Sequence, residues 1–178
     1  RVTTLLSPPH QSEDVYRYIW DARMSAMGIN PYEHPPNAPE LVSVRDDFVY
    51  PRINSKPYVT AYPPVSQVLF RISFGLFGTS VFAMKAVFSF FEFLTLLVAW
   101  RLLILWGKSV QTLILLAWNP FFIFEFSHSG HSDSAMMFLI LLLFASLVSW
   151  LTGAGSDALI IAAIVLANAT ISFIQEYK

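Results

Sequence analysis

The sequence predicts an all-α membrane protein, a multi-span helical bundle with an external proline-rich loop and a short interfacial helix. Hydrophobic residues make up 55% of the chain and charged residues only 13%, whereas soluble domains carry about 25% charged residues. More than half of the charges and most of the prolines lie in the first sixty residues. We therefore divide the chain into an external loop region, residues 1–64, and a transmembrane region, residues 65–178.

The composition excludes several classes of protein. A net charge of −1 provides no basic field for nucleic acid. The chain contains no cysteine, so disulfides, thiolate nucleophiles and cysteine-based zinc sites are ruled out. It begins at Arg1 without a methionine and stops directly after an apolar run, and we expect it to be part of a larger membrane protein.

The external region is predicted to contain one amphipathic helix, residues 12–27. Ser12 suits its N-cap and Gly28 its C-terminal stop. Residues at helical spacing form one apolar stripe, namely Val15, Tyr18, Ile19, Ala22 and Ala26. From residue 30 to 64 the prolines predict an irregular chain, which needs water or folded protein around it because lipid cannot satisfy its backbone.

The transmembrane region divides into one short helix and four spans. Residues 65–77 reach only about 20 Å at 1.5 Å per residue, short of a hydrocarbon core of about 30 Å, and Arg71 interrupts them. An interfacial helix is the better interpretation. The predicted spans cover about 81–105, 110–126, 134–151 and 158–174, with a kink at Asn119-Pro120 in the second.

The orientation follows from the loop charges. The turn after the first span carries Arg101 and Lys108 without an acid between them, so the positive-inside rule places residues 106–108 in the cytoplasm. Residues 1–60 and the loop 127–133 are then external.

Two polar clusters consequently face the same compartment. The first comprises Glu13, Asp14, Arg17, Tyr18 and Asp21, in which Asp14, Tyr18 and Asp21 share one helix face. Its ordinary interpretation is a set of helix-start acids with an Arg17–Asp21 surface pair.

The second cluster contains His128, His131 and Asp133, within seven residues at the mouth of a membrane helix. Its ordinary interpretation is a solvated turn in which Asp133 caps the next helix. A turn needs only glycine and serine for its geometry, so two imidazoles and a carboxylate there favour function.

A series of motifs resembles one family. SEDVYRYIWDAR, GINPY, PRIN, YPP, WNP and SGHSD occur in order, and together they resemble the polyprenol-phosphate-sugar-dependent mannosyltransferases of the C-type glycosyltransferase superfamily. The resemblance covers roughly residues 7–140. It is closest to bacterial membrane enzymes and more distant to the first mannosyltransferase of GPI-anchor assembly. It implies a partial C-type glycosyltransferase fold, and it favours the bacterial inner membrane over the endoplasmic reticulum.

The resemblance also implies a reaction. Mannose or a related hexose passes, with inversion, from a polyprenol-phosphate donor to a hydroxyl of a glycan or glycolipid acceptor at the external face. An acid of the first external loop acts as general base; the family usually shows paired aspartates where this chain has Glu13-Asp14, which makes Asp14 the first candidate and Glu13 the second. The resemblance implies no cofactor and no metal ligands, and it leaves a need for a divalent metal open.

The departing lipid phosphate needs cationic or hydrogen-bonding partners, for which Arg17, His128 and His131 are candidates. Tyr18, Asp21, Lys85 and Asp133 complete the predicted substrate-binding set. Lys85 either snorkels to the external interface or contacts the donor phosphate, and we expect Glu92 to pair with another helix.

Other readings remain open. His128, His131 and Asp133 are all metal-ligand types, although their spacing matches no diagnostic pattern. Lys85, Glu92 and the broken Asn119-Pro120 helix are compatible with a membrane transporter, but the paired repeats of many transporters are missing. A third reading is a non-catalytic module that binds lipid-linked sugar. An enzyme requires Asp14 and the loop 128–133 to meet at one external cavity.

Overall fold

The computed structural model describes residues 1–9 and 12–151, and in these residues it contains helices and no strand. The predicted all-α class is therefore confirmed. The helices, in chain order, are α1 (Val2–Leu6), α2 (Asp14–Ala26), η1 (Pro39–Val44), η2 (Tyr50–Arg52), α3 (Pro64–Phe77), α4 (Val81–Leu105), η3 (Val110–Thr112), α5 (Leu113–Ala117), α6 (Pro120–Phe122), η4 (Ile123–His128) and α7 (Asp133–Leu151). The predicted fourth span, 158–174, lies outside the described residues.

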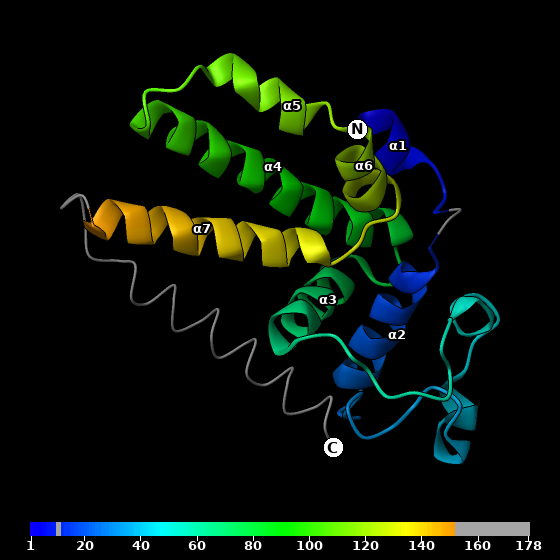
Figure 1. Ribbon diagram of the computed structural model, residues 1–178. Coiled ribbons are helices and arrows are strands. Elements are labelled where there is room, and N and C mark those ends of the chain that lie inside the picture. Colours follow the sequence, from blue (N-terminus) through cyan, green and yellow to red (C-terminus); the bar gives the residue numbers. More distant parts are fainter. Residues whose placement is uncertain (10–11, 152–178) are drawn as a thin grey trace.

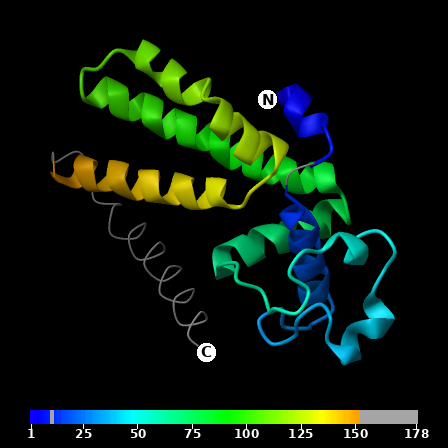
Figure 2. The ribbon, with the colours of Figure 1, turned by 45° about the vertical axis from the view of Figure 1, so that its right-hand side comes forward.

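Two of these helices are long and apolar enough to cross a membrane. They are α4, with 25 residues, and α7, with 19. They pack side by side and run in the same direction (Figures 1 and 2). The chain that connects them returns through α5, which runs back along α4. A third candidate span follows if the segments Val110–Ala117 and Pro120–His128, which run from η3 to η4, are counted as one bent span.

That bent span breaks where the sequence predicts a kink. The segments Val110–Ala117 and Pro120–His128 meet at an angle of 54°. Pro120 has no N–H to continue the helical ladder, and the Asn119 side chain instead accepts a hydrogen bond from the backbone N–H of Phe121 at 3.0 Å. The chain then widens into the π-helical turn η4, which delivers it to the loop before α7.

Helix α2 forms within the predicted range 12–27. The Ser12 hydroxyl accepts a hydrogen bond from the Asp14 N–H at 3.3 Å. At the other end Gly28 has φ +77°, which lets the Ile29 N–H donate to the Met24 carbonyl at 2.9 Å. The predicted apolar stripe is buried apart from Ala26, which is exposed because it is the last residue of the helix, just before the chain turns away.

An aromatic core fixes α2 against the membrane helices. The Tyr18 ring stacks on Phe70 of α3 with the ring centroids 4.3 Å apart, and it meets Phe88 of α4 edge-on at 5.6 Å. Tyr62 approaches the same ring at 4.8 Å. Burying each such ring stabilises the fold by about 1.5–3 kcal/mol, so the start of α2 is held beside the first turns of α4.

Helix α3 has the extent expected of the short apolar element. It begins at Pro64, whose missing N–H is not needed there, and it ends at Gly78, where φ is +61°. Arg71 is exposed. That α3 lies along the membrane surface without crossing remains a prediction.

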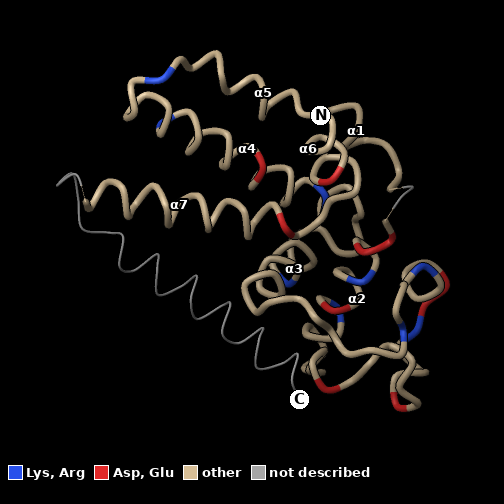
Figure 3. The backbone as a smooth tube through the Cα atoms, viewed as in Figure 1, with Lys and Arg blue, Asp and Glu red and all other residues tan. Residues whose placement is uncertain are grey.

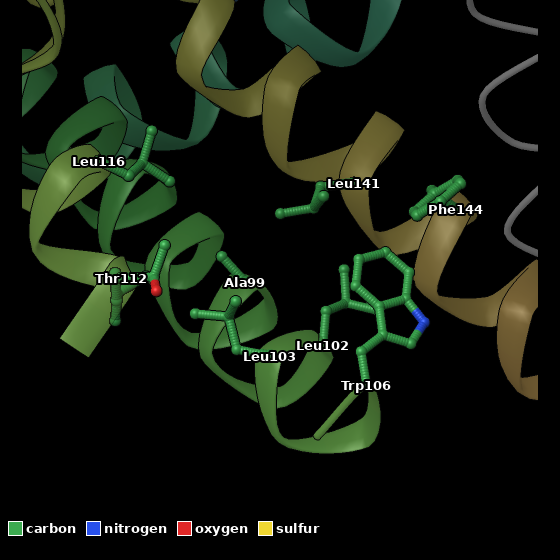
Figure 4. Close-up of a pocket in the computed structure, with 9 residues that line it drawn as sticks. Ala99, Leu102, Leu103, Trp106, Thr112, Leu116, Leu141 and Phe144 are labelled. Atoms are coloured by element: carbon green, nitrogen blue, oxygen red, sulfur yellow. The ribbon is translucent and has the colours of Figure 1, made fainter. Parts of the chain in front are cut away.

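Charged residues and apolar surface lie in different parts of the molecule. Figure 3 shows acidic and basic residues gathered around α2 and the proline-rich loop, while α7 carries no charge after Asp133. Toward the C-terminal end of α4, an apolar cavity of about 330 Å³ lies between α4, α5 and α7 (Figure 4). No charged side chain lines this cavity.

Candidate functional site

The two polar clusters of the sequence lie together in the structure. Asp14 is the first residue of α2, and its Oδ2 atom lies 3.6 Å from Nε2 of His131, in the loop between η4 and α7. One turn along α2, the Tyr18 hydroxyl accepts a hydrogen bond from the Ser132 N–H at 3.3 Å. Two segments that are far apart in the chain therefore form one site where α2 meets the membrane helices.

Asp14 combines a fixed position with access to a cavity. Its Oδ1 atom accepts a hydrogen bond from Asn54 Nδ2 at 2.5 Å, and its side chain is 29% exposed. It lines a cavity of about 260 Å³, whose wall consists of Asp14, Arg17, Asn54, Ser55, Tyr58, Val59, Ala61 and Tyr62. A carboxylate at such a wall can accept a proton from a bound hydroxyl.

Arg17 and Asp21 pair as predicted, but they do so inside the protein. Arg17 Nε donates to Asp21 Oδ1 at 2.8 Å, and the two side chains are 4% and 1% exposed. The interpretation as a surface pair is wrong because α3 and the segment before it cover both residues. Burial raises the pKa of Asp21, although the charge of Arg17 and hydrogen bonds to the carboxylate oppose that shift.

The Arg17 guanidinium retains an unused donor. Nη1 donates to the Ser55 carbonyl at 3.4 Å, whereas Nη2 is buried and has no hydrogen-bond partner among the described residues. A buried donor without a partner costs free energy. Because Arg17 lines the cavity of Asp14, an oxygen of a bound anion or sugar can satisfy this donor.

His131 is held from its other side by Glu125. Its Nδ1 atom lies 2.5 Å from Glu125 Oε2, and its backbone N–H donates to the Glu125 carbonyl at 3.1 Å. Both links arise because η4 carries Glu125 at the end of the bent span. Our reading of the sequence missed Glu125, although an acid within a predicted span is itself a functional signal.

Gly130 brings this loop close to α4. Its φ is +73°, and a Cβ atom there would lie 2.7 Å from Cγ of Lys85 and 3.3 Å from its Cα. Only glycine combines that backbone conformation with such an approach. The loop carrying His131 is thereby set against the N-terminal end of α4.

Lys85 caps helix α1. Its ammonium donates to the carbonyls of Thr4, Leu5 and Ser7 at 3.1, 3.0 and 2.7 Å, and the side chain is almost completely buried. All three of its donors are therefore in use, and it does not line the cavity of Asp14. A contact between Lys85 and the donor phosphate stays a prediction without support from this geometry.

Glu92 pairs with other elements, as expected. It accepts hydrogen bonds from Arg1 Nε at 2.9 Å and from the Ser127 hydroxyl at 2.8 Å. Next to Ser127, His128 Nδ1 lies 2.8 Å from the Ser7 hydroxyl. His128 is buried at the junction of α1 and η4, whereas Asp133 and Glu13 are exposed at the starts of their helices.

Tyr18 and Tyr62 remain neutral hydroxyls at ordinary pH. Burial raises the pKa of both well above the usual value, and at Tyr18 the hydrogen bonds with Ser132 act in the opposite direction. Both are therefore neutral hydrogen-bonding groups and not bases. Tyr62 lines the cavity of Asp14, whereas Tyr18 does not. Within residues 1–9 and 12–151, no group of three or more His, Asp or Glu side chains could hold a metal ion.

Comparison with known proteins gives one match. Residues 2–175 match the family model for the alpha-(1->6)-mannopyranosyltransferase N-terminal domain. Searches of curated proteins and of solved structures found no match.

Proposed function

Because this chain belongs to the alpha-(1->6)-mannopyranosyltransferase family, whose N-terminal domain it matches over residues 2–175, we propose that it transfers mannose from a polyprenol phosphate. The acceptor is a hydroxyl of a glycan or glycolipid, the reaction takes place at the external face of the membrane, and it inverts the anomeric centre. The candidate membrane helices agree with an integral membrane enzyme, and we propose the bacterial inner membrane as its location.

The position of Asp14 is the observation that supports this proposal best. Its carboxylate lines a cavity outside the apolar helices and lies against the loop that carries His131. In the proposed reaction Asp14 takes the proton of the acceptor hydroxyl as that oxygen bonds to the anomeric carbon. The bond from this carbon to the phosphate oxygen breaks on the opposite side, and its electron pair leaves with the lipid phosphate.

The remaining wall of the cavity suits a sugar phosphate. The free Nη2 donor of Arg17 can bind a phosphate or sugar oxygen. Tyr58, which is 70% exposed, presents an aromatic ring at the same cavity. Asp21 holds Arg17 through their ion pair, while Tyr18, His128 and Asp133 remain predicted contacts of the substrates.

The arrangement favours an enzyme over a transporter. Lys85 and Glu92, the charged residues on which a transport path would depend, are engaged by α1, Arg1 and Ser127. A module that only binds lipid-linked sugar differs from an enzyme in one property, since it needs no base. The substitution of Asp14 therefore separates the two functions.

The test is Asp14→Asn in the full-length enzyme. Asparagine keeps the size of the side chain, can still accept the hydrogen bond from Asn54 and cannot take a proton. We expect turnover with a polyprenol-phosphate mannose donor to fall by about 10²–10⁴-fold, while insertion and protein level stay unchanged.

Glu13→Gln is the matched control, because Glu13 is the neighbouring acid and does not line the cavity. We expect it to retain most of the activity. Near wild-type turnover of Asp14→Asn would show that the base lies elsewhere, and binding without turnover in the wild-type enzyme would favour the non-catalytic module.

A further inference from the structure

The His131 ring lies between two carboxylates and uses only one of its nitrogens. Nδ1 is 2.5 Å from Glu125 Oε2. Nε2 is buried, has no hydrogen-bond partner among the described residues, and faces Asp14 Oδ2 at 3.6 Å. A buried ring nitrogen that is aimed at the proposed base without bonding to it needs an explanation.

We propose that Glu125 is a positioning residue that holds His131 as a proton acceptor for Asp14. Glu125, His131 and Asp14 then form a relay that removes the acceptor's proton from the base. This inference rests on the proposed function, because it assigns a second step to the same proton.

The hydrogen-bond pattern fixes the tautomer that this relay requires. An ionised carboxylate can only accept, so the short contact with Glu125 places the ring proton on Nδ1. The neutral ring then has a lone pair on Nε2, which faces the lone pairs of an ionised Asp14. In this state Nε2 and Asp14 Oδ2 are both acceptors and form no hydrogen bond, which agrees with their separation of 3.6 Å and with the absence of a partner for Nε2 among the described residues.

Protonation of Asp14 changes this contact. When the acceptor hydroxyl gives up its proton, the O–H bond of the acceptor breaks and an O–H bond forms on Asp14. The new O–H group can donate to Nε2, and the proton moves to His131 as the carboxylate of Asp14 is restored. The resulting imidazolium lies between two carboxylates, and its Nδ1 proton can leave to water through Glu125, whose side chain is 28% exposed.

The local backbone keeps His131 in place for this role. The His131 N–H donates to the Glu125 carbonyl at 3.1 Å, so the same residue binds both the ring and the backbone. Gly130 presses the loop against Lys85, which in turn is anchored on α1. Asn54 fixes the other oxygen of Asp14, so both partners of the 3.6 Å contact are held.

The test is a double-mutant cycle in the full-length enzyme, with Glu125→Gln, His131→Ala and the double variant. The amide oxygen of glutamine can still accept a hydrogen bond from Nδ1–H, but the side chain carries no charge to stabilise the imidazolium. We expect Glu125→Gln to lower kcat by about tenfold or more with little change in KM. In the His131→Ala background it should cause no further loss, because Glu125 acts only through that ring.

The chain offers a matched control in a second histidine–glutamate pair. His34 Nδ1 lies 2.8 Å from Glu40 Oε1, both side chains are exposed, and neither lines the cavity. Glu40→Gln should leave kcat unchanged. If His131→Ala fails to accumulate as folded protein, His131→Gln completes the cycle with a polar side chain of similar size.

Two results would overturn the relay: wild-type kcat in Glu125→Gln, or losses from the two substitutions that multiply in the double variant. Multiplying losses would indicate that Glu125 only supports the loop. The proposed function is tested separately, since it fails if Asp14→Asn is active. An inactive Asp14→Asn together with a fully active Glu125→Gln would reject the relay alone.

Discussion

Replacing Gly130 by alanine tests the close approach that positions the loop carrying His131. The new Cβ would lie 2.7 Å from Lys85 Cγ and 3.3 Å from Lys85 Cα. The Lys85 side chain cannot retract, because three carbonyls hold its ammonium, and its Cα belongs to the rigid helix α4. The loop must therefore move, and it carries His131.

The cost has two parts. Placing alanine at φ +73° costs about 1–2 kcal/mol, and overpacking against α4 adds about 1–3 kcal/mol. Gly107→Ala separates them, because Gly107 also has a positive φ, +61°, but a Cβ there meets nothing within 4 Å. At about 2–4 °C per kcal/mol, we expect Gly130→Ala to unfold roughly 2–12 °C below Gly107→Ala.

The assay is thermal unfolding of the purified full-length enzyme in detergent, followed by mannosyl transfer at a temperature where every variant is folded. Gly130→Ala should also lose transfer, since the His131 ring shifts with the loop, whereas Gly107→Ala should stay active. Equal unfolding temperatures and equal transfer for the two variants would refute the argument that the loop is packed directly on Lys85.

Three further results are expected. Lys85→Met removes the charged donor of three hydrogen bonds, each of which contributes about 1.5–3 kcal/mol to stability, so residues 1–7 should become sensitive to limited proteolysis. Continued resistance would show that α1 docks without the ammonium. Burial alone would raise the pKa of Asp46, but the N–H of Val49 and the Arg23 guanidinium together bring it below its ordinary value of 3.8. Its stabilising contribution is therefore present above pH 3.8 and is lost as the pH falls through the lower folded-state value, so thermal unfolding should be more acid-sensitive in the wild type than in Asp46→Asn; equal sensitivity would contradict this. Finally, Ser43→Cys should react with an impermeant thiol reagent in intact cells and Ser109→Cys should not, both positions being exposed; the opposite pattern would reverse the proposed orientation.

The sequence predicted the helices best where local chemistry decides their ends. Prolines and glycines mark both ends of α3, and the long apolar run of α4 is helical over the residues predicted, since a chain in lipid must satisfy its own backbone. The short helix α1 was missed. Its C-terminal carbonyls accept hydrogen bonds from Lys85, some eighty residues away, and no local sequence pattern predicts such a distant partner.

The site, too, was predicted only where local sequence patterns reveal it. Asp14 and His131 stood out as polar groups at a helix start and in an interhelical turn. Asn54 did not, because it lies in an irregular proline-rich segment whose path only the folded chain defines. The buried Arg17–Asp21 pair was misplaced on the surface, because helical spacing shows which residues meet but not what covers them.

The contact between Tyr18 and Ser132 joins residues 114 positions apart in the chain, and this has a consequence for biosynthesis. At a translation rate of about 5–20 residues per second, roughly 6–23 s pass between the synthesis of these two residues. During this time α2 acquires its neighbours in the order in which the ribosome delivers them: Asn54 and Tyr62 precede Phe70 and Phe88, and the loop of His131 comes last. The aromatic core can therefore pack against α2 before the bent candidate span is synthesised. The proposed base, Asp14, can contact His131 only when the chain has been made up to the start of α7.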